Sequence, residues 1–113
     1  MHEMSLAEGI LEVVEATARR ERARRVKRVI LEIGALAGVE IEALRFCFNA
    51  VTRTTLAEHA ALDIITTAGR GWCLPCGLEV PLTALADACP HCGSFQVQPV
   101  AGMEMRVKEI DIE

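Results

Sequence analysis

The sequence has few aromatic residues and no long apolar run. Its 113 residues include one tryptophan, three phenylalanines and no tyrosine. Proteins that bind single-stranded nucleic acid stack bases on aromatic side chains, and a helix that spans a bilayer needs about 20 largely apolar residues. The start of the chain also lacks a basic region followed by an apolar stretch and a cleavage site. We therefore expect a cytoplasmic protein that binds neither nucleic acid nor membrane.

The usual motifs of catalysis are also missing. The chain contains no Ser-His-Asp set, no phosphate-binding glycine loop and no pattern of paired carboxylates. His59 has no partner at the spacing of metal ligands, so we expect it in a loop. The sequence gives no grounds for an enzyme.

Basic residues are concentrated in one short segment, although the formal net charge is −4. The preferred interpretation is a solvated helix end, where cations meet the negative pole of the helix dipole. The alternative is a binding patch, which would dock an acidic protein surface rather than nucleic acid. This basic segment, residues 19–28, contains seven of the twelve basic residues: Arg19, Arg20, Arg22, Arg24, Arg25, Lys27 and Arg28.

Four of the five cysteines form a twin C-x2-C motif. The pairs are Cys73 with Cys76 and Cys89 with Cys92, and the twelve residues between them allow a short hairpin to bring the pairs together. Four thiolates complete a tetrahedral zinc site, which supplies folding energy rather than chemistry. A rubredoxin-like iron site is the main rival, but Trp72 and Phe95 are the module's only aromatics to shield a redox centre.

Each C-x2-C pair forms a knuckle, and the residues near the two knuckles are expected to support the metal site or to lie apart from it. Gly77 and Gly93 each follow the last cysteine of a pair, where a small residue lets backbone amides turn toward the sulfurs. His91 is expected to be an exposed spacer rather than a ligand. The fifth cysteine, Cys47, lies on an apolar helical stripe and is expected to be buried.

The first residues, Met1-His2-Glu3, place an imidazole next to a free α-amine. The Met1 amine, the deprotonated His2 amide and the His2 ring can then bind one ion through consecutive planar chelate rings. Planar nitrogen coordination selects Ni(II) or Cu(II) over zinc, magnesium or calcium. The adjacent Glu3 offers an additional carboxylate.

Periodicity predicts two helices. Ser5-Leu6-Ala7-Glu8 fits a capping box, so the first helix is expected to begin there, and the second is expected between Gly38 and Thr52. Their apolar stripes are predicted to comprise Leu6, Ile10, Val13, Val14 and Thr17 in the first helix, and Leu44, Cys47, Phe48 and Val51 in the second.

Three segments are expected to be strands. They are 26–33, which ends at Gly34, then 61–67, and a strand after Gly102. In the last of these, Met103, Met105 and Val107 should share one face, with a bulge or a change of exposure near Glu109. Residues 69–71 are expected to mark a boundary before the cysteine module.

These elements predict an α+β fold, with a small three-stranded sheet, two helices and an inserted zinc-ribbon-like module. Two strands alone cannot bury a sheet well, so the C-terminal strand should join them. The predicted domains are residues 1–67 with 101–113, and residues 68–100.

Several segments together resemble the HypA/HybF hydrogenase maturation proteins over essentially the whole chain. They are the opening Met1–Ser5, Leu31–Gly34 with Gly38–Glu40, Leu44–Phe48, the cysteine knuckles, and Gly102–Glu104. The resemblance implies a metallochaperone that carries Ni(2+) and holds a structural Zn(2+). It further implies a nickel-handling GTPase as partner and the large subunit of [NiFe] hydrogenase as recipient. By position, the nickel ligands would come from Met1, His2, Glu3 and Glu40, and the zinc ligands would be Cys73, Cys76, Cys89 and Cys92.

Two other functions remain open from the residues alone. A zinc-ribbon module that binds nucleic acid would bind DNA or RNA in a salt-sensitive way. A rubredoxin-like electron carrier would be coloured and redox active. The zinc and nickel interpretation instead predicts a protein that is colourless until nickel is added.

Overall fold

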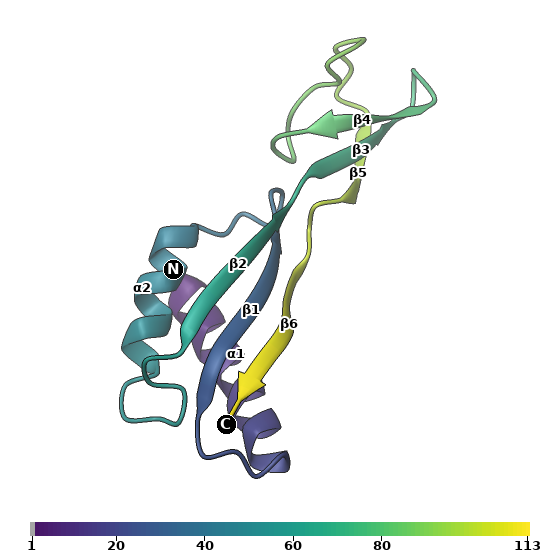
Figure 1. The fold of residues 1–113 in the computed structure, drawn as a ribbon. Coiled ribbons are helices and arrows are strands. Elements are labelled where there is room, and N and C mark those ends of the chain that lie inside the picture. The colour runs from purple at the N-terminus through teal and green to yellow at the C-terminus, as the bar shows by residue number, and fades with distance from the viewer. Residues whose placement is uncertain (1) are drawn as a thin grey trace. The chain divides into compact units, whose positions relative to one another are not determined.

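The computed structural model describes residues 2–113, which form two helices and six strands (Figure 1). Both predicted helices and all three predicted strands are present. The elements in chain order are α1 (His2–Arg20), β1 (Val26–Gly34), α2 (Ile41–Val51), β2 (Ala61–Thr67), β3 (Gly69–Cys73), β4 (Leu78–Leu82), β5 (Val97–Ala101) and β6 (Met105–Ile112).

The strands form two separate three-stranded sheets. The first has the order β2-β1-β6, so the C-terminal strand does join the two earlier strands, as predicted. The second has the order β4-β3-β5 and carries the cysteine module, with β3 antiparallel to both neighbours. The predicted α+β fold with an inserted zinc-ribbon-like module is confirmed.

The chain divides into two compact units. Unit 1 comprises residues 1–31, 39–64 and 107–113, and unit 2 comprises residues 32–38 and 65–106. Strands β1, β2 and β6 each contribute residues to both units. The domain boundaries expected from the sequence, at 67/68 and 100/101, stay a prediction.

The core of unit 1 comes from α1, α2 and the first half of β1. Helices α1 and α2 pack against each other, and Phe48 and Leu44 of α2 are fully buried. Val26, Val29 and Leu31 of β1 are buried as well, and Cys47 is 3% exposed, as expected for a packed thiol. The second helix is therefore held by the apolar stripe that its sequence predicts.

The prediction for the start of α1 is wrong. The helix already includes His2, so Ser5 lies inside it rather than at a cap. Its buried face also differs from the predicted stripe, because Val13 is 50% exposed. The buried face includes small residues and one carboxylate; its positions are Glu3, Ala7, Ile10, Val14 and Ala18.

Residues 69–71 belong to strand β3, the first strand of the sheet that carries the cysteine module, and the boundary expected there stays a prediction. A Cβ on Gly69 would lie 2.4 Å from the Leu82 backbone oxygen, so glycine here serves close strand packing rather than chain reversal.

Met103 and Met105 are both about half exposed and do not form a buried face. Lys108 and Glu109 are both exposed, which interrupts the alternation of β6 where a change was expected.

Neither helix in residues 2–113 is long and apolar enough to cross a membrane.

Candidate metal sites

The four knuckle cysteines converge on one point in unit 2. Their Sγ atoms all lie within 4.8 Å of one another. Cys73 and Cys92 are separated by 3.6 Å between sulfurs, and Cys76 and Cys89 by 4.0 Å. A tetrahedral site with Zn–S bonds of about 2.3 Å has sulfur–sulfur edges of about 3.8 Å. The four cysteines are thus positioned to hold a metal ion as in a zinc ribbon.

The two knuckles share one backbone geometry. The N–H of Gly77 donates to the carbonyl of Cys73 at 2.8 Å, and the N–H of Gly93 donates to the carbonyl of Cys89 at 2.9 Å. Gly77 and Gly93 have φ values of 66° and 76°. Residues with a Cβ rarely adopt this left-handed conformation, which is why glycine follows each pair.

The hydrogen bonds of the second knuckle favour the charged form of one thiol. The backbone N–H of Cys92, together with that of His91 at 3.3 Å, lowers the pKa of Cys89 to about 6. The neighbouring thiols of Cys92 and Cys73 instead raise the pKa of Cys76 to about 12. Cys89 can therefore bind a metal ion as a thiolate that is already ionised. Cys76 must first lose its proton, which the charge of the metal ion favours.

The module has little apolar material besides these cysteines. Its buried cluster consists of Cys73, Val80 and Cys89, with Cys76 and Val97 packed against it. Trp72 and Phe95 are 42% and 77% exposed, so they do not enclose the sulfurs. So small a core needs a metal ion for stability. The cluster thus lacks the aromatic shield expected around a redox-active iron centre.

The side chain of His91 is exposed, and only its backbone N–H contacts the cysteine cluster. His59 lies in an exposed turn with φ 67°, as a loop residue. Both histidines thus match the roles expected from the sequence.

Near the start of the chain, unit 1 brings His2 close to Glu3, and Glu3 close to the backbone of Glu40. The His2 Nδ1 atom lies 3.8 Å from the Glu3 Oε2 atom, and the Glu40 N–H donates to the same oxygen at 3.1 Å. The His2 side chain is 58% exposed, whereas that of Glu3 is 10% exposed. Met1, the fourth predicted ligand residue, lies outside the described residues.

Glu40 has a structural role that its sequence position did not reveal. It is the N-cap of α2, and its carboxylate accepts from the N–H of Glu42 at 3.2 Å. Its own N–H lowers the pKa of Glu3, since it stabilises the Glu3 carboxylate. His2 lies in the first turn of α1, where backbone N–H groups have no acceptor inside the helix.

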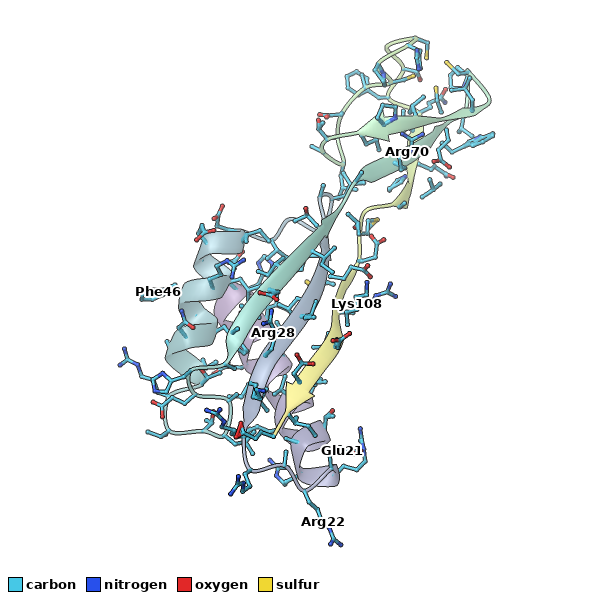
Figure 2. All side chains as sticks on the ribbon, in the orientation of Figure 1. Glu21, Arg22, Arg28, Phe46, Arg70 and Lys108 are labelled. Carbon is cyan, nitrogen blue, oxygen red and sulfur yellow. The ribbon has the colours of Figure 1, made fainter. Side chains whose placement is uncertain are left out.

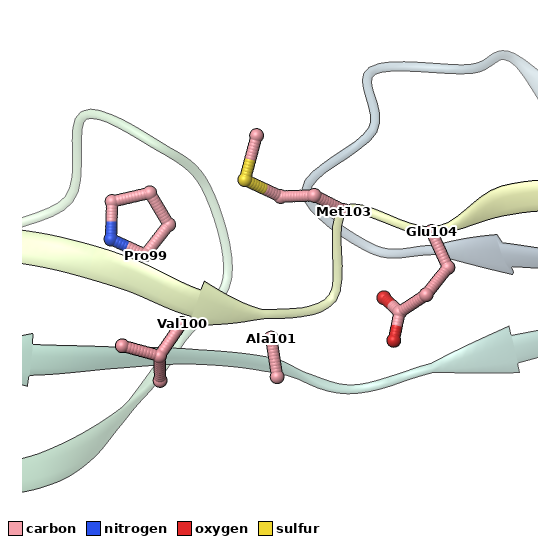
Figure 3. Close-up of a pocket in the computed structure, with 5 residues that line it drawn as sticks. All are labelled: Pro99, Val100, Ala101, Met103 and Glu104. Carbon is pink, nitrogen blue, oxygen red and sulfur yellow. The ribbon is translucent and has the colours of Figure 1, made fainter.

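Unit 2 also has an open hollow beside β5, with a volume of about 430 Å³ (Figure 3). Its lining contains one carboxylate, from Glu104, and one thioether, from Met103. A single donor of each kind does not make a chelating site. The lining residues are Pro99, Val100, Ala101, Met103 and Glu104.

Comparison with known proteins identifies the family. Residues 1–112 match the family model "HypA", described as hydrogenase/urease nickel incorporation, metallochaperone. The chain belongs to the HypA family. It is 64% identical to the hydrogenase maturation factor HypA of Dechloromonas aromatica over all of both chains. It is 57% identical to that of an Azoarcus species, over 97% of this chain and 96% of the relative.

Two solved HypA structures have the same fold. The solution structure of the Ni metallochaperone HypA from Helicobacter pylori aligns with a TM-score of 0.69 and 24% identity, over 99% of this chain and 97% of that one. A second HypA solution structure aligns with a TM-score of 0.71 and 25% identity, over 100% of this chain and 97% of that one. The family resemblance expected from the sequence is confirmed: the HypA family is described as metallochaperones of hydrogenase or urease nickel incorporation.

Proposed function

We propose that this chain binds Ni(II) at its N-terminus and delivers it, with a nickel-handling GTPase, to the large subunit of [NiFe] hydrogenase in the cytoplasm. The Met1 amine, the His2 amide and the His2 imidazole supply a planar set of nitrogens. Cys73, Cys76, Cys89 and Cys92 hold a structural zinc ion, while Glu3 and Glu40 complete the surroundings of the nickel.

One observation carries the nickel assignment: His2 stands in the first turn of α1, beside a buried carboxylate. Its backbone N–H is not needed for an intrahelical hydrogen bond, so losing that proton to a metal costs the helix nothing. The helix gives the residue a defined backbone, unlike a mobile terminus. The nearby Glu3 carboxylate offsets the charge of the cation, which the helix dipole alone would repel.

This arrangement suits transfer rather than storage. Competing ligands can remove metal from a chain terminus while the buried core of unit 1 stays folded. Amine and amide nitrogens must lose protons to bind, so nickel affinity falls as the pH decreases. A partner that offers competing ligands can therefore take the ion from the terminus.

Isothermal titration of nickel tests the site. Acetylation of the α-amine removes one donor, and His2→Ala removes another. Each should weaken nickel binding at least about tenfold, or about 1.4 kcal/mol, with zinc content and melting temperature unchanged. A His91→Ala protein is the matched control, since that imidazole is exposed and remote in sequence. Unchanged affinity in both N-terminal variants would place nickel elsewhere.

Delivery is tested in cells that lack the chain. A chaperone raises the effective supply of metal to its client. Hydrogenase activity at trace nickel should therefore be low in the deletion strain and partly restored by excess nickel. Normal hydrogenase activity in the deletion strain at trace nickel would contradict the proposal that hydrogenase receives the nickel, though not the proposal that the chain binds it.

A further inference from the structure

Five basic side chains near the end of α1 face solvent without an acidic partner. Within the basic segment, Arg25 pairs with Glu113 at 2.8 Å, and Arg28 pairs with Asp63 and Asp111 of the neighbouring strands. The remaining five form no ion pair within residues 2–113, and all are exposed. We call them the basic patch: Arg19, Arg20, Arg22, Arg24 and Lys27.

The centre of the basic patch is conformationally strained. Helix α1 ends in a Schellman motif, in which Ala23 N–H donates to Ala18 at 2.8 Å and Arg22 N–H donates to Arg19 at 3.1 Å. Arg22 occupies the left-handed position of this motif with φ 56°, where glycine is the usual residue. Figure 2 shows its side chain projecting away from the end of the helix. No ion pair of the Arg22 guanidinium within the described chain offsets the energy of this strained backbone.

The backbone beneath the patch is fixed. Arg24 N–H donates to the Glu113 carbonyl at 2.8 Å, and Glu113 N–H donates to the Arg25 carbonyl at 2.9 Å. Val26 N–H donates to Leu56 at 2.8 Å. These bonds hold the segment between α1 and β1, so binding there need not order a flexible tail.

We propose that the basic patch docks an acidic surface of a partner protein. The guanidinium fork binds carboxylates with two parallel hydrogen bonds. Arg22 has no such carboxylate within the described chain, and a partner protein would supply one. The charge distribution favours a protein over a nucleic acid. Outside the basic segment (residues 19–28) the chain has only five basic residues against fifteen acidic ones, and residues 2–31 contain no aromatic side chain for base stacking.

The patch lies away from the N-terminus. Arg20 and His2 stand at opposite ends of α1, about 27 Å apart at 1.5 Å per residue. A protein bound at the patch would leave the His2 end of the helix accessible. Docking at the patch requires no bound nickel.

The first test measures stability and binding in the same variants. Arg22→Gly should relieve the left-handed strain and raise the melting temperature of the zinc-loaded protein by about 2–4 °C. Arg22→Ala should not raise it, because alanine keeps the Cβ. Both variants should bind a fluorescein-labelled peptide of twelve glutamates at least threefold more weakly than the parent protein. If Arg22→Gly gained no stability, or if both variants bound the peptide normally, the proposal would be wrong.

The second test uses matched charge reversals. Lys27→Glu should weaken binding of the glutamate peptide at least fivefold, whereas Lys108→Glu should change it less than twofold. Both lysines are exposed, lie on strands of one sheet and produce the same change of net charge. Equal effects of the two reversals would indicate net charge rather than a patch. Tighter binding of a single-stranded oligonucleotide or of phosphatidylserine vesicles than of the peptide would overturn the choice of partner.

Discussion

The backbone N–H of Glu40 donates to the Oε2 atom of Glu3 at 3.1 Å and so links the first turn of α1 to the beginning of α2. Within residues 2–113, Glu3 is one of two buried polar residues, at 8% exposure. Because Oε2 already accepts this bond, we expect Glu3 to hold the terminal site in position more than to supply a free ligand. The two acidic residues near the proposed nickel site thus depend on each other.

A first prediction concerns acid stability. The Glu40 N–H lowers the folded-state pKa of Glu3 below its ordinary value of 4.5. Stability from this carboxylate is therefore complete above the unfolded-state pKa and is lost as the pH falls through the lower folded-state value. Glu3→Gln should lower the free energy of unfolding at neutral pH and weaken its dependence on pH below about 4.5. Urea unfolding between pH 3 and 7 measures both effects.

The control for this variant is Glu8→Gln, which changes an exposed carboxylate of the same helix. It should leave the pH dependence of unfolding close to that of the parent. If the two variants had the same pH profile, the contact between Glu3 and Glu40 would contribute nothing to stability.

A second prediction separates the two roles of Glu40. Glu40→Ala removes both the N-cap and the carboxylate, and should cost about 1 kcal/mol of stability. Glu40→Asn keeps a capping oxygen and should cost much less, while it still removes the charge. If the carboxylate helps to hold nickel, both variants should weaken nickel binding equally in a calorimetric titration. A loss of nickel affinity in the alanine variant alone would assign Glu40 to helix capping only.

Much of the fold could be predicted because local patterns and tertiary contacts agree. The stripe that contains Leu44, Cys47 and Phe48 predicts α2, and these side chains are buried. The need for a third strand predicts that the C-terminal strand joins the first two, as β6 does, although the order β2-β1-β6 was not predicted. The spacing of the twin C-x2-C pairs predicts the sulfur cluster, since only a few backbone arrangements bring two such pairs together.

The errors occurred where packing overrides local pattern. Ser5 fits a capping box, but α1 continues past it to His2, where the buried Glu3 carboxylate meets the start of α2. No local pattern reports that contact, because its partners are 37 residues apart. The need for glycine at position 69 is also absent from the local pattern, because it comes from Leu82 on a neighbouring strand.

A third prediction concerns the cysteine cluster. Replacing Cys73 and Cys92 together by serine should remove zinc and loosen residues 68–100, since the module's own core is small. The matched control is Cys47→Ala, which changes the cysteine buried in unit 1 and should retain one zinc per chain. Elemental analysis measures the metal, and amide hydrogen exchange measures the loosening. Full zinc retention in the double variant would contradict the four-thiolate assignment.

The last prediction follows from the unequal thiols of the metal-free module. Cys89, with its pKa lowered to about 6 by the N–H groups of Cys92 and His91, is already largely ionised at pH 7. Cys76, with its pKa raised to about 12, still carries its proton. Zinc binding at pH 7 should therefore release fewer than four protons per ion, and the number should rise toward four when the reaction is carried out at pH 5.

Calorimetric titration of zinc in buffers of different ionisation enthalpy counts these protons. His91→Ala should leave the count and the zinc affinity unchanged, because His91 reaches the cluster only through its backbone N–H. Removing that N–H with His91→Pro should raise the pKa of Cys89 and so increase the number of protons released at pH 7. A release of four protons at both pH values in the parent protein would mean that the knuckle amides do not favour the Cys89 thiolate.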